Sequence, residues 1–176
     1  MKIRPLEAGL CRALVPLVHD WETFYRGRKE STSEEVRSYL ERILDEPSGG
    51  AVIVACEGEQ ILAFATYAIL YPAPCRSGQL YMKELFVSPG ARGRGVGKKM
   101  MKYLARLACS RGCSRFDWTA ERTNPGAGAF YRELGARTVS EKEYYRLDGA
   151  DLERFAGIPL TVPPKSGSAP DPLITD

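Results

Sequence analysis

The fold is decided by a glycine-rich hexapeptide, Arg92-Gly93-Arg94-Gly95-Val96-Gly97. It stands between an apolar stretch, Leu85-Phe86-Val87, and an amphipathic stretch that begins at Lys98. A strand that feeds a helix through such a loop forms an anion cradle, because glycines let the backbone approach a ligand and the first N–H groups of the helix favour phosphate. The sequence therefore predicts a ligand that carries phosphates.

The spacing of the hexapeptide excludes two common phosphate loops. A dinucleotide-binding G-x-G-x-x-G motif would need glycine at position 98, where Lys98 stands. A P-loop would need glycine at position 92 and Ser or Thr at position 99, where the chain has Arg92 and Lys99. What remains is Arg92-x-x-Gly95-x-Gly97, preceded by Val87-Ser88-Pro89. A glycine-rich turn with basic residues on a solvated face is the alternative interpretation.

A second motif follows about 30 residues later, Asn124-Pro125-Gly126-Ala127-Gly128-Ala129-Phe130-Tyr131, and it is followed by Leu134-Gly135-Ala136. The two motifs resemble the acetyl-coenzyme A signature of the GNAT superfamily of N-acetyltransferases. In that family the first has the form [QR]-x-x-G-x-[GA] after V-x-P, and the second runs from an Asn to a Tyr seven residues on. The resemblance extends over roughly residues 2–156.

Within the superfamily, the chain looks most like the spermidine/spermine and thialysine N-acetyltransferase branch. The similar stretches are Leu62-Ala63-Phe64-Ala65-Thr66-Tyr67, Leu80-Tyr81-Met82-Lys83-Glu84-Leu85-Phe86-Val87 and Tyr145-Arg146-Leu147. The resemblance implies acetyl-CoA as cofactor. The cofactor-binding residues that it implies are Leu85, Phe86, Val87, Arg92, Gly93, Arg94, Gly95, Val96, Gly97, Lys98, Asn124, Ala127, Phe130 and Tyr131.

Two residues are predicted to be catalytic. A protonated amine must lose a proton before it attacks a carbonyl, and the carbonyl oxygen must be stabilised. Glu84 is the candidate base, and Tyr131 is the candidate donor of a proton to the leaving thiolate. In the family, a backbone N–H of the strand that corresponds to Leu85-Phe86-Val87 holds the oxygen. The ordinary structural explanations are an ion pair of Glu84 with Lys83 or Arg92 and a buried aromatic role for Tyr131.

The resemblance also implies an acidic pocket for a small primary amine. The matching acids are Glu22, Glu84 and Glu143, and Trp21 and Tyr145 are candidate walls that would make cation–π contacts, unless they simply pack in the core. One departure from the branch is Lys83-Glu84, where two consecutive acids are common. A lysine there weakens the prediction of polyamine specificity.

Three functions are therefore considered. The first is transfer of an acetyl group from acetyl-CoA by direct attack of a small cationic acceptor, which is a diamine, a polyamine or an amino acid. The second is acetylation of protein or peptide amines. The third is a non-catalytic CoA-binding interaction module. Turnover with an amine panel separates the third function from the others.

Composition narrows the class of protein. The chain has 176 residues, 44% of them hydrophobic, a net charge of +3 and a pI near 8.6, which suits one enzyme domain and is too mild for nucleic-acid binding. Its five cysteines form no C-x-x-C pair and predict neither a metal site nor disulfides. The sequence shows no signal peptide and no membrane span, so a cytoplasmic protein is expected.

Periodicity predicts a mixed α/β fold, with a mostly antiparallel sheet of six to seven strands flanked by about four helices. The last two strands are expected near residues 136–139 and 143–147, and their exposed edge is the predicted contact of a homodimer. Residues 1–157 are expected to form the acetyltransferase domain. Residues 158–176 are proline-rich and are expected to lack fixed structure.

Overall fold

The computed structural model describes residues 1–45 and 50–158. The chain divides into two compact units, Met1–Gly135 and Ala136–Asp176. Apart from Ile158, the predicted tail lies outside the described residues. Among the described helices, none has the length and apolar character that a membrane crossing requires.

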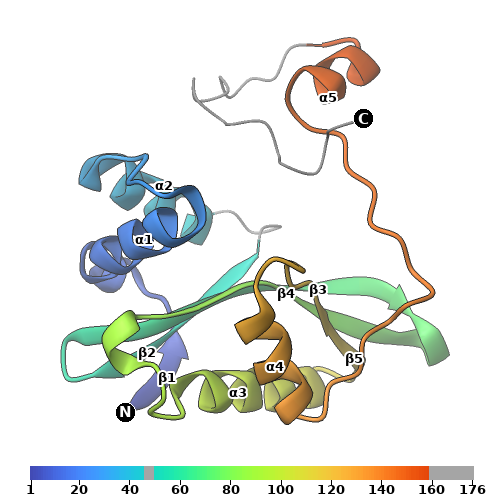
Figure 1. Ribbon diagram of the computed structural model, residues 1–176, viewed down its shortest axis with the longest axis horizontal. Helices are drawn as coiled ribbons and strands as arrows, with labels where there is room; N and C mark the ends of the chain where they lie inside the picture. The colour runs from blue at the N-terminus through green and yellow to red at the C-terminus, as the bar shows by residue number, and fades with distance from the viewer. Residues whose placement is uncertain (46–49, 159–176) are drawn as a thin grey trace. The chain divides into compact units, whose positions relative to one another are not determined.

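The first unit is built on one five-stranded sheet in the order β1-β2-β3-β4-β5 (Figure 1). Neighbouring strands run antiparallel except β4 and β5, which are parallel. The parallel pair is connected through a helix, as parallel strands require. The strands are β1 (Lys2–Pro5), β2 (Ala51–Glu57), β3 (Gln60–Ala73), β4 (Ser77–Val87) and β5 (Cys113–Trp118).

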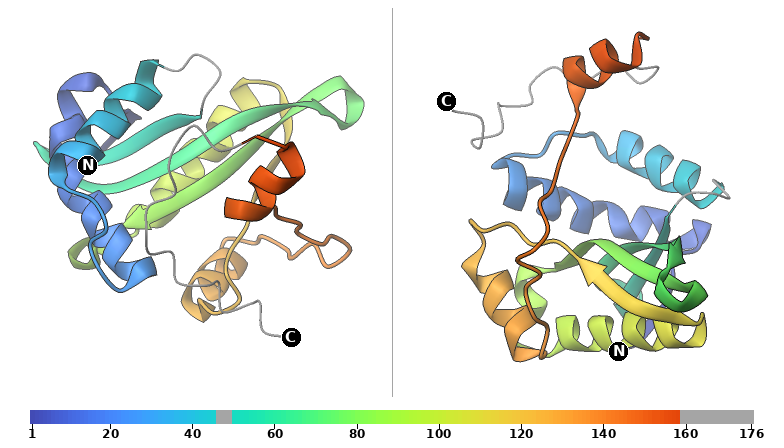
Figure 2. Two further views of the ribbon diagram at one scale, coloured as in Figure 1. Left: turned by 90° about the horizontal axis from the view of Figure 1, so that it is seen from above. Right: turned by 90° about the vertical axis from the view of Figure 1, so that its right-hand side faces the viewer.

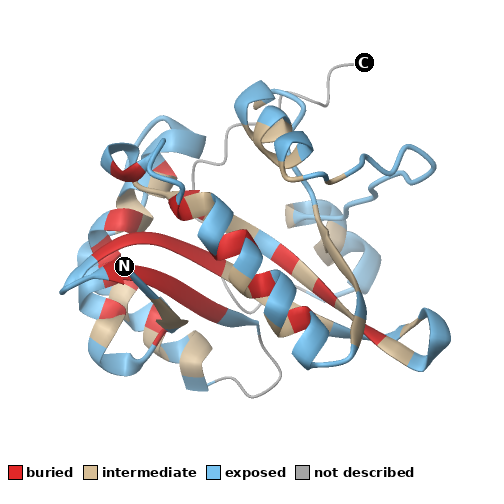
Figure 3. Cartoon of the chain, turned by 90° about the horizontal axis from the view of Figure 1, so that it is seen from below, coloured by how far each residue is buried: buried red, intermediate tan, exposed pale blue. Residues whose placement is uncertain are grey.

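Helices cover both faces of this sheet (Figure 2). On one face, α1 (Cys11–Arg26) and α2 (Ser33–Asp45) bury apolar stripes such as Leu14 and Leu40 against β2 and β3. On the other face, α3 (Val96–Ser110) buries Met100 and Leu104, and α4 (Pro125–Glu133) packs beside it. The buried stripe of α3 and the buried strands are visible in Figure 3. Three short 3-10 helices complete the unit: η1 (Ala8–Leu10), η2 (Pro74–Arg76) and η3 (Pro89–Ala91).

A β-bulge in β4 changes which residues face each layer. Thr66 of β3 pairs with Glu84 and Tyr67 pairs with Met82, so Lys83 is the extra residue. Before the bulge, Met82 packs in the α3 layer. After it, Phe86 packs in the α1 layer, and Glu84, two residues earlier on the strand, faces the same way.

The ladder between β4 and β5 ends at the bulge. Its last pair is Met82 with Trp118, whereas β4 continues to Val87. Beyond Met82, the backbone groups on that side of β4 therefore have no partner in β5. This is where the family resemblance implies a backbone donor for the carbonyl oxygen.

The predicted order of elements is confirmed from β1 to α4, but the number of strands is wrong. The described residues hold five strands, and residues 136–148 form none. Alternating side chains are not enough for a strand, because an extended backbone also needs a ladder partner for its N–H and C=O groups. The second unit contributes a fifth α-helix, α5 (Gly149–Ala156), where about four helices were expected in total.

Candidate active site

The glycine-rich hexapeptide forms an open turn before α3. Gly93 and Gly95 have positive φ angles of 73° and 75°, and Gly95 caps α3. A Cβ atom at either glycine would meet nothing within 4 Å. The first N–H groups of α3 have no acceptor inside the helix, and successive amides in such turns form anion-binding concavities. This turn therefore fits a phosphate group.

Gly97 has a different role from the other two glycines. A Cβ atom there would lie 3.2 Å from Cζ of Phe130 and 3.6 Å from Cγ2 of Val87. The missing side chain lets α4 approach α3 and the end of β4. Gly97 thus brings the predicted phosphate turn next to the helix that carries Tyr131.

Both arginines of the hexapeptide contact protein groups. The guanidinium of Arg92 lies over the rings of Phe24 and Phe86, at 5.0 Å and 5.6 Å from their centres, and its Nε donates to the Val87 carbonyl at 3.2 Å. Nη2 of Arg94 lies 2.8 Å from Oε2 of Glu57. Arg92 therefore fastens the turn to α1 and β4. Arg94 is paired with an acid of β2.

Glu84 lies where α1 crosses β4. Its Oε2 accepts a hydrogen bond from Nε1 of Trp21 at 3.3 Å, and its Oε1 lies 3.5 Å from Nζ of Lys83. The side chain is 25% exposed, so solvent and an acceptor can reach it. Two predicted acceptor-site residues, Trp21 and Glu84, are thus in direct contact. The predicted pairing with Lys83 is also present.

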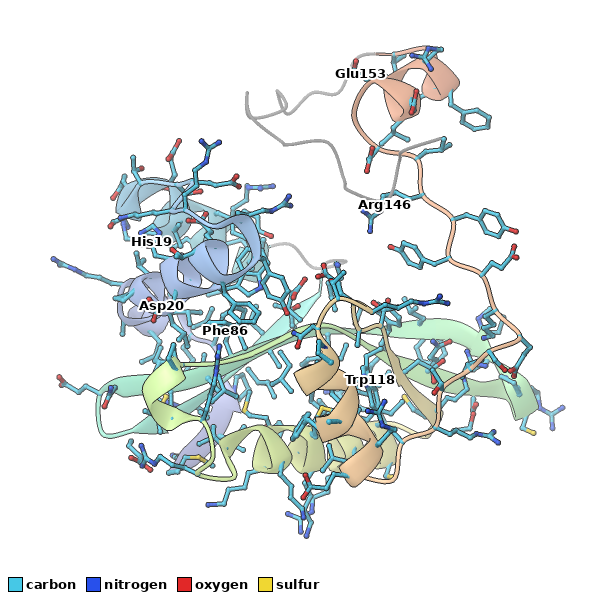
Figure 4. The ribbon with its side chains drawn as sticks, in the orientation of Figure 1. His19, Asp20, Phe86, Trp118, Arg146 and Glu153 are labelled. Atoms are coloured by element: carbon cyan, nitrogen blue, oxygen red, sulfur yellow. The ribbon has the colours of Figure 1, made fainter. Side chains whose placement is uncertain are left out.

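Tyr131 projects from α4 toward the same region. Its ring centre lies 5.1 Å from that of Trp118, the last residue of β5, which Figure 4 labels. Burial raises the pKa of Tyr131 to about 12, and the nearby Tyr25 and Glu84 add to the shift. A phenol with this pKa remains protonated at neutral pH. It can therefore serve as a proton donor.

Asn124 is the N-cap of α4. Its side-chain oxygen accepts from the backbone N–H of Ala127 at 3.1 Å, and Pro125 occupies the first helical position. Capping thus accounts for the Asn-Pro pair without a ligand. The Asn124 side chain still carries an amide nitrogen that can donate to a cofactor.

Comparisons with known proteins agree with this geometry. The sequence profile described as the acetyltransferase (GNAT) family matches residues 15–136. The chain belongs to the GNAT family. The resemblance that the two motifs suggest is thereby confirmed.

Among relatives of this GNAT chain, a thialysine N-epsilon-acetyltransferase of Sus scrofa is 30% identical over 104 residues. That match covers 57% of the chain but only 61% of the relative's length. An aminoglycoside N(6')-acetyltransferase type 1 of Klebsiella aerogenes is 28% identical over 122 residues, which cover 68% of the chain and 80% of the relative. A solved integron cassette protein from the mobile metagenome of V. cholerae has a TM-score of 0.84 and 46% identity, and the match covers 88% of this chain and 96% of that one.

The carboxylate of Glu22 in the GNAT chain is engaged within the protein. The residue is only 7% exposed, and its Oε2 lies 3.2 Å from Nδ1 of His19 and accepts from the backbone N–H groups of Glu30 and Ser31. Burial raises the pKa of this carboxyl, but the hydrogen bonds from the Ser31 side chain, from His19 and from the two backbone N–H groups outweigh burial and lower the pKa below its usual value. Glu22 therefore ties α1 to the segment that precedes α2; its partner His19 is labelled in Figure 4.

Glu143 and Tyr145 belong to the second unit. The Tyr145 hydroxyl donates to Oε2 of Glu143, and Tyr145 is 82% exposed. These two residues therefore contact each other within the second unit. Their role beside Glu84 stays a prediction.

One feature of the GNAT chain was missed at the sequence level. A pocket of about 250 Å3 is lined by Phe24, Tyr25, Glu121, Thr123, Asn124 and Pro125. It joins the C-terminal end of α1 to the loop between β5 and α4. Periodicity cannot show that these segments meet, because they are almost 100 residues apart. The only available signal was that Glu121 comes three residues before the Asn124 motif.

Proposed function

We propose that the protein transfers an acetyl group from acetyl-CoA to a primary amine of a small cationic acceptor by direct attack. The observations that carry this proposal are geometric: Nε1 of Trp21 in α1 donates to the Glu84 carboxylate, and the Tyr131 ring packs against Trp118, the last residue of β5. These groups lie where β4 and β5 separate. Such a reaction needs a group that accepts a proton from the ammonium and one that donates a proton to the leaving thiolate, and an aromatic ring can hold the cation in place.

Acetyl-CoA would be held by the residues of the two motifs. The backbone amides of the turn at Gly93–Gly97 would bind its pyrophosphate, and Lys98 would add a charge-assisted contact. The open space beside Gly93 and Gly95 supports this fit. The amide nitrogen of Asn124 and the small side chain of Ala127 would border its pantetheine arm. When bound, the cofactor supplies the acetyl thioester.

The protein's own groups would then move two protons. Glu84 would accept a proton from the ammonium group of the acceptor, through its exposed carboxylate oxygen or one water molecule. Tyr131 would donate its phenolic proton to the leaving sulfur. Backbone N–H groups of Leu85–Val87, beyond the last rung shared with β5, would stabilise the carbonyl oxygen.

A small cationic acceptor is favoured by the charges around Glu84. A carboxylate beside an indole ring is suited to an alkylammonium group. Named relatives include a thialysine N-epsilon-acetyltransferase and an L-ornithine N5-acetyltransferase, whose names denote small amines. Lys83 stands next to Glu84, which argues for acceptors with few positive charges over long polyamines. Protein amines and a non-catalytic CoA-binding role remain the competing functions.

The proposed function is tested by acetyl-CoA turnover with matched panels. The panels are free diamines and amino acids on one side and peptides with free N-termini or lysines on the other. We expect turnover with the free amines and little with the peptides. Higher turnover with peptides would show that protein or peptide amines are the acceptors. CoA binding without any turnover would support the non-catalytic module.

The pairing of Arg94 with Glu57 gives a prediction about cofactor affinity. Arg94 keeps the pKa of the Glu57 carboxyl below its usual value, so the acid is charged and competes with phosphate for the same guanidinium. Glu57→Gln should tighten CoA binding by about threefold, the scale of an exposed ion pair. Calorimetric titration of CoA measures this. Glu59→Gln, in the adjacent turn, is the matched control and should leave affinity unchanged; equal or weaker binding by Glu57→Gln contradicts the competition.

We further propose that residues 1–157 work as one acetyltransferase domain and that the protein is a homodimer. The strand edge predicted at residues 136–147 is absent from the described residues, but the described part of the second unit exposes apolar side chains: Val139, Tyr144, Tyr145, Leu147, Phe155 and Ile158. Exposed apolar groups favour association. Light scattering after size exclusion should give twice the mass of one chain, 19.5 kDa. Truncation after residue 135 should give a monomer, and a monomeric full chain would refute the dimer.

A further inference from the structure

The pocket between α1 and the loop before α4 has the chemistry of a cation site. Its walls come from two segments: Phe24 and Tyr25 end α1, and Glu121 and Thr123 precede α4. The rings of Phe24 and Tyr25 meet edge to face, with centres 4.9 Å apart. Trp21, which bonds to Glu84, lies 5.8 Å from Tyr25 by ring centres. An aromatic row thus leads from the pocket to the proposed reaction site.

The charges around Tyr25 are mostly negative. Partial burial raises the pKa of its phenol, and the carboxylates of Glu84 and Glu121 raise it further. Arg92 acts in the opposite direction, but its guanidinium is held over Phe24 and Phe86. Tyr25 therefore lies within the electrostatic reach of two acids, one at the reaction site and one in the pocket.

We infer that this pocket binds a second ammonium group of the acceptor, one that does not react, with Glu121 as its counter-ion and the Tyr25 ring as its wall. The inference rests on the proposed function and adds a specificity determinant to it. Glu84 would receive the reacting nitrogen, and Glu121 would select acceptors that carry a further positive charge. The preferred acceptors would be diamines over monoamines of the same chain length.

The test compares 1,3-diaminopropane with propylamine, and the five-carbon pair of the same kind, as acceptors for the full chain. In Glu121→Gln the KM for the diamines should rise about fivefold, the upper range for a partly exposed charge pair, with kcat nearly unchanged. The KM for the monoamines should not change. Glu7→Gln removes an exposed carboxylate whose side chain does not cap η1, and it should leave all four acceptors unaffected.

The outcomes separate this inference from the proposed function. Turnover of both amines with an equal effect of Glu121→Gln on each, or with no effect, overturns the pocket and leaves the acetyltransferase intact. Absence of turnover in the wild type overturns the function. In that case calorimetric titration of the diamine still decides on the pocket: binding weakened by Glu121→Gln supports it, and binding that Glu121→Gln leaves unchanged, or no binding, rejects it.

Discussion

Replacing Tyr131 by phenylalanine should lower kcat by about 100-fold or more, the usual scale for loss of a positioned general acid. The phenol has a pKa of about 12 in its buried position, so it carries its proton at any ordinary assay pH. The substitution removes only the hydroxyl, and the ring keeps its contact with Trp118. Affinity for CoA should therefore remain close to that of the wild type. Steady-state kinetics and calorimetric titration of CoA measure the two effects separately.

Tyr67→Phe is the matched control for that substitution. Tyr67 is also a partly buried tyrosine whose pKa is raised by burial, but it lies on β3 against the α3 layer. Loss of the Tyr67 hydroxyl should leave kcat within about twofold of the wild type, because Tyr67 has no role in the proposed site and substitutions away from special features usually have small effects. Unchanged turnover in Tyr131→Phe would reject the proton-donor role and leave Tyr131 as a packing residue of α4.

Gly95→Val should weaken CoA binding by about tenfold or more. A tenfold loss of affinity is the scale of one good polar contact between the turn and the phosphate. The backbone of Gly95 has a φ of 75°, which β-branched residues adopt only with strain. The new side chain would also fill the open space in front of the α3 amides, where the pyrophosphate is proposed to lie. Both effects act on the turn that is proposed to hold the cofactor and not on the proposed acceptor site.

Gly90→Val provides the comparison. A Cβ atom at Gly90 also meets nothing within 4 Å, but its φ lies outside the left-handed region, so a side chain there adds volume with less strain. It should bind CoA like the wild type. Thermal unfolding of both variants shows whether the fold is intact. A folded Gly95→Val protein with normal CoA affinity would place the phosphates elsewhere.

Much of the first unit could be predicted because its signals are local. Helical stripes in α1 and α2 and the glycine turn before α3 each lie within a few residues of the chain. The family resemblance placed Trp21 and Glu84 in one predicted pocket, and the structure adds the hydrogen bond between them, which no periodicity shows. What the sequence could not show is which partners a buried polar group has: the carboxylate of Glu22, a predicted acceptor-site residue, binds His19 and backbone amides.

The two remaining differences depend on distant partners. Residues 136–147 alternate like strands, but alternation does not say which strand would complete their hydrogen bonds. Tyr25 and Glu121 line one pocket although neither belongs to a recognisable motif. Both features arise from tertiary contacts, so they became visible only in three dimensions.

The extra residue at Lys83 also constrains how this chain could be rebuilt. In a strand of uninterrupted pleat, Glu84 would fall on the same side as Met82, inside an apolar layer where an ionised carboxylate is costly. The β-bulge turns the Glu84 side chain toward α1, which carries Trp21. It also keeps Leu85 and Val87 packed against the apolar core on the α3 side. A graft of Ser77–Val87 onto another scaffold must therefore include the irregular pairing with β3. Without it, the Glu84 carboxylate would lie on the apolar face of the sheet.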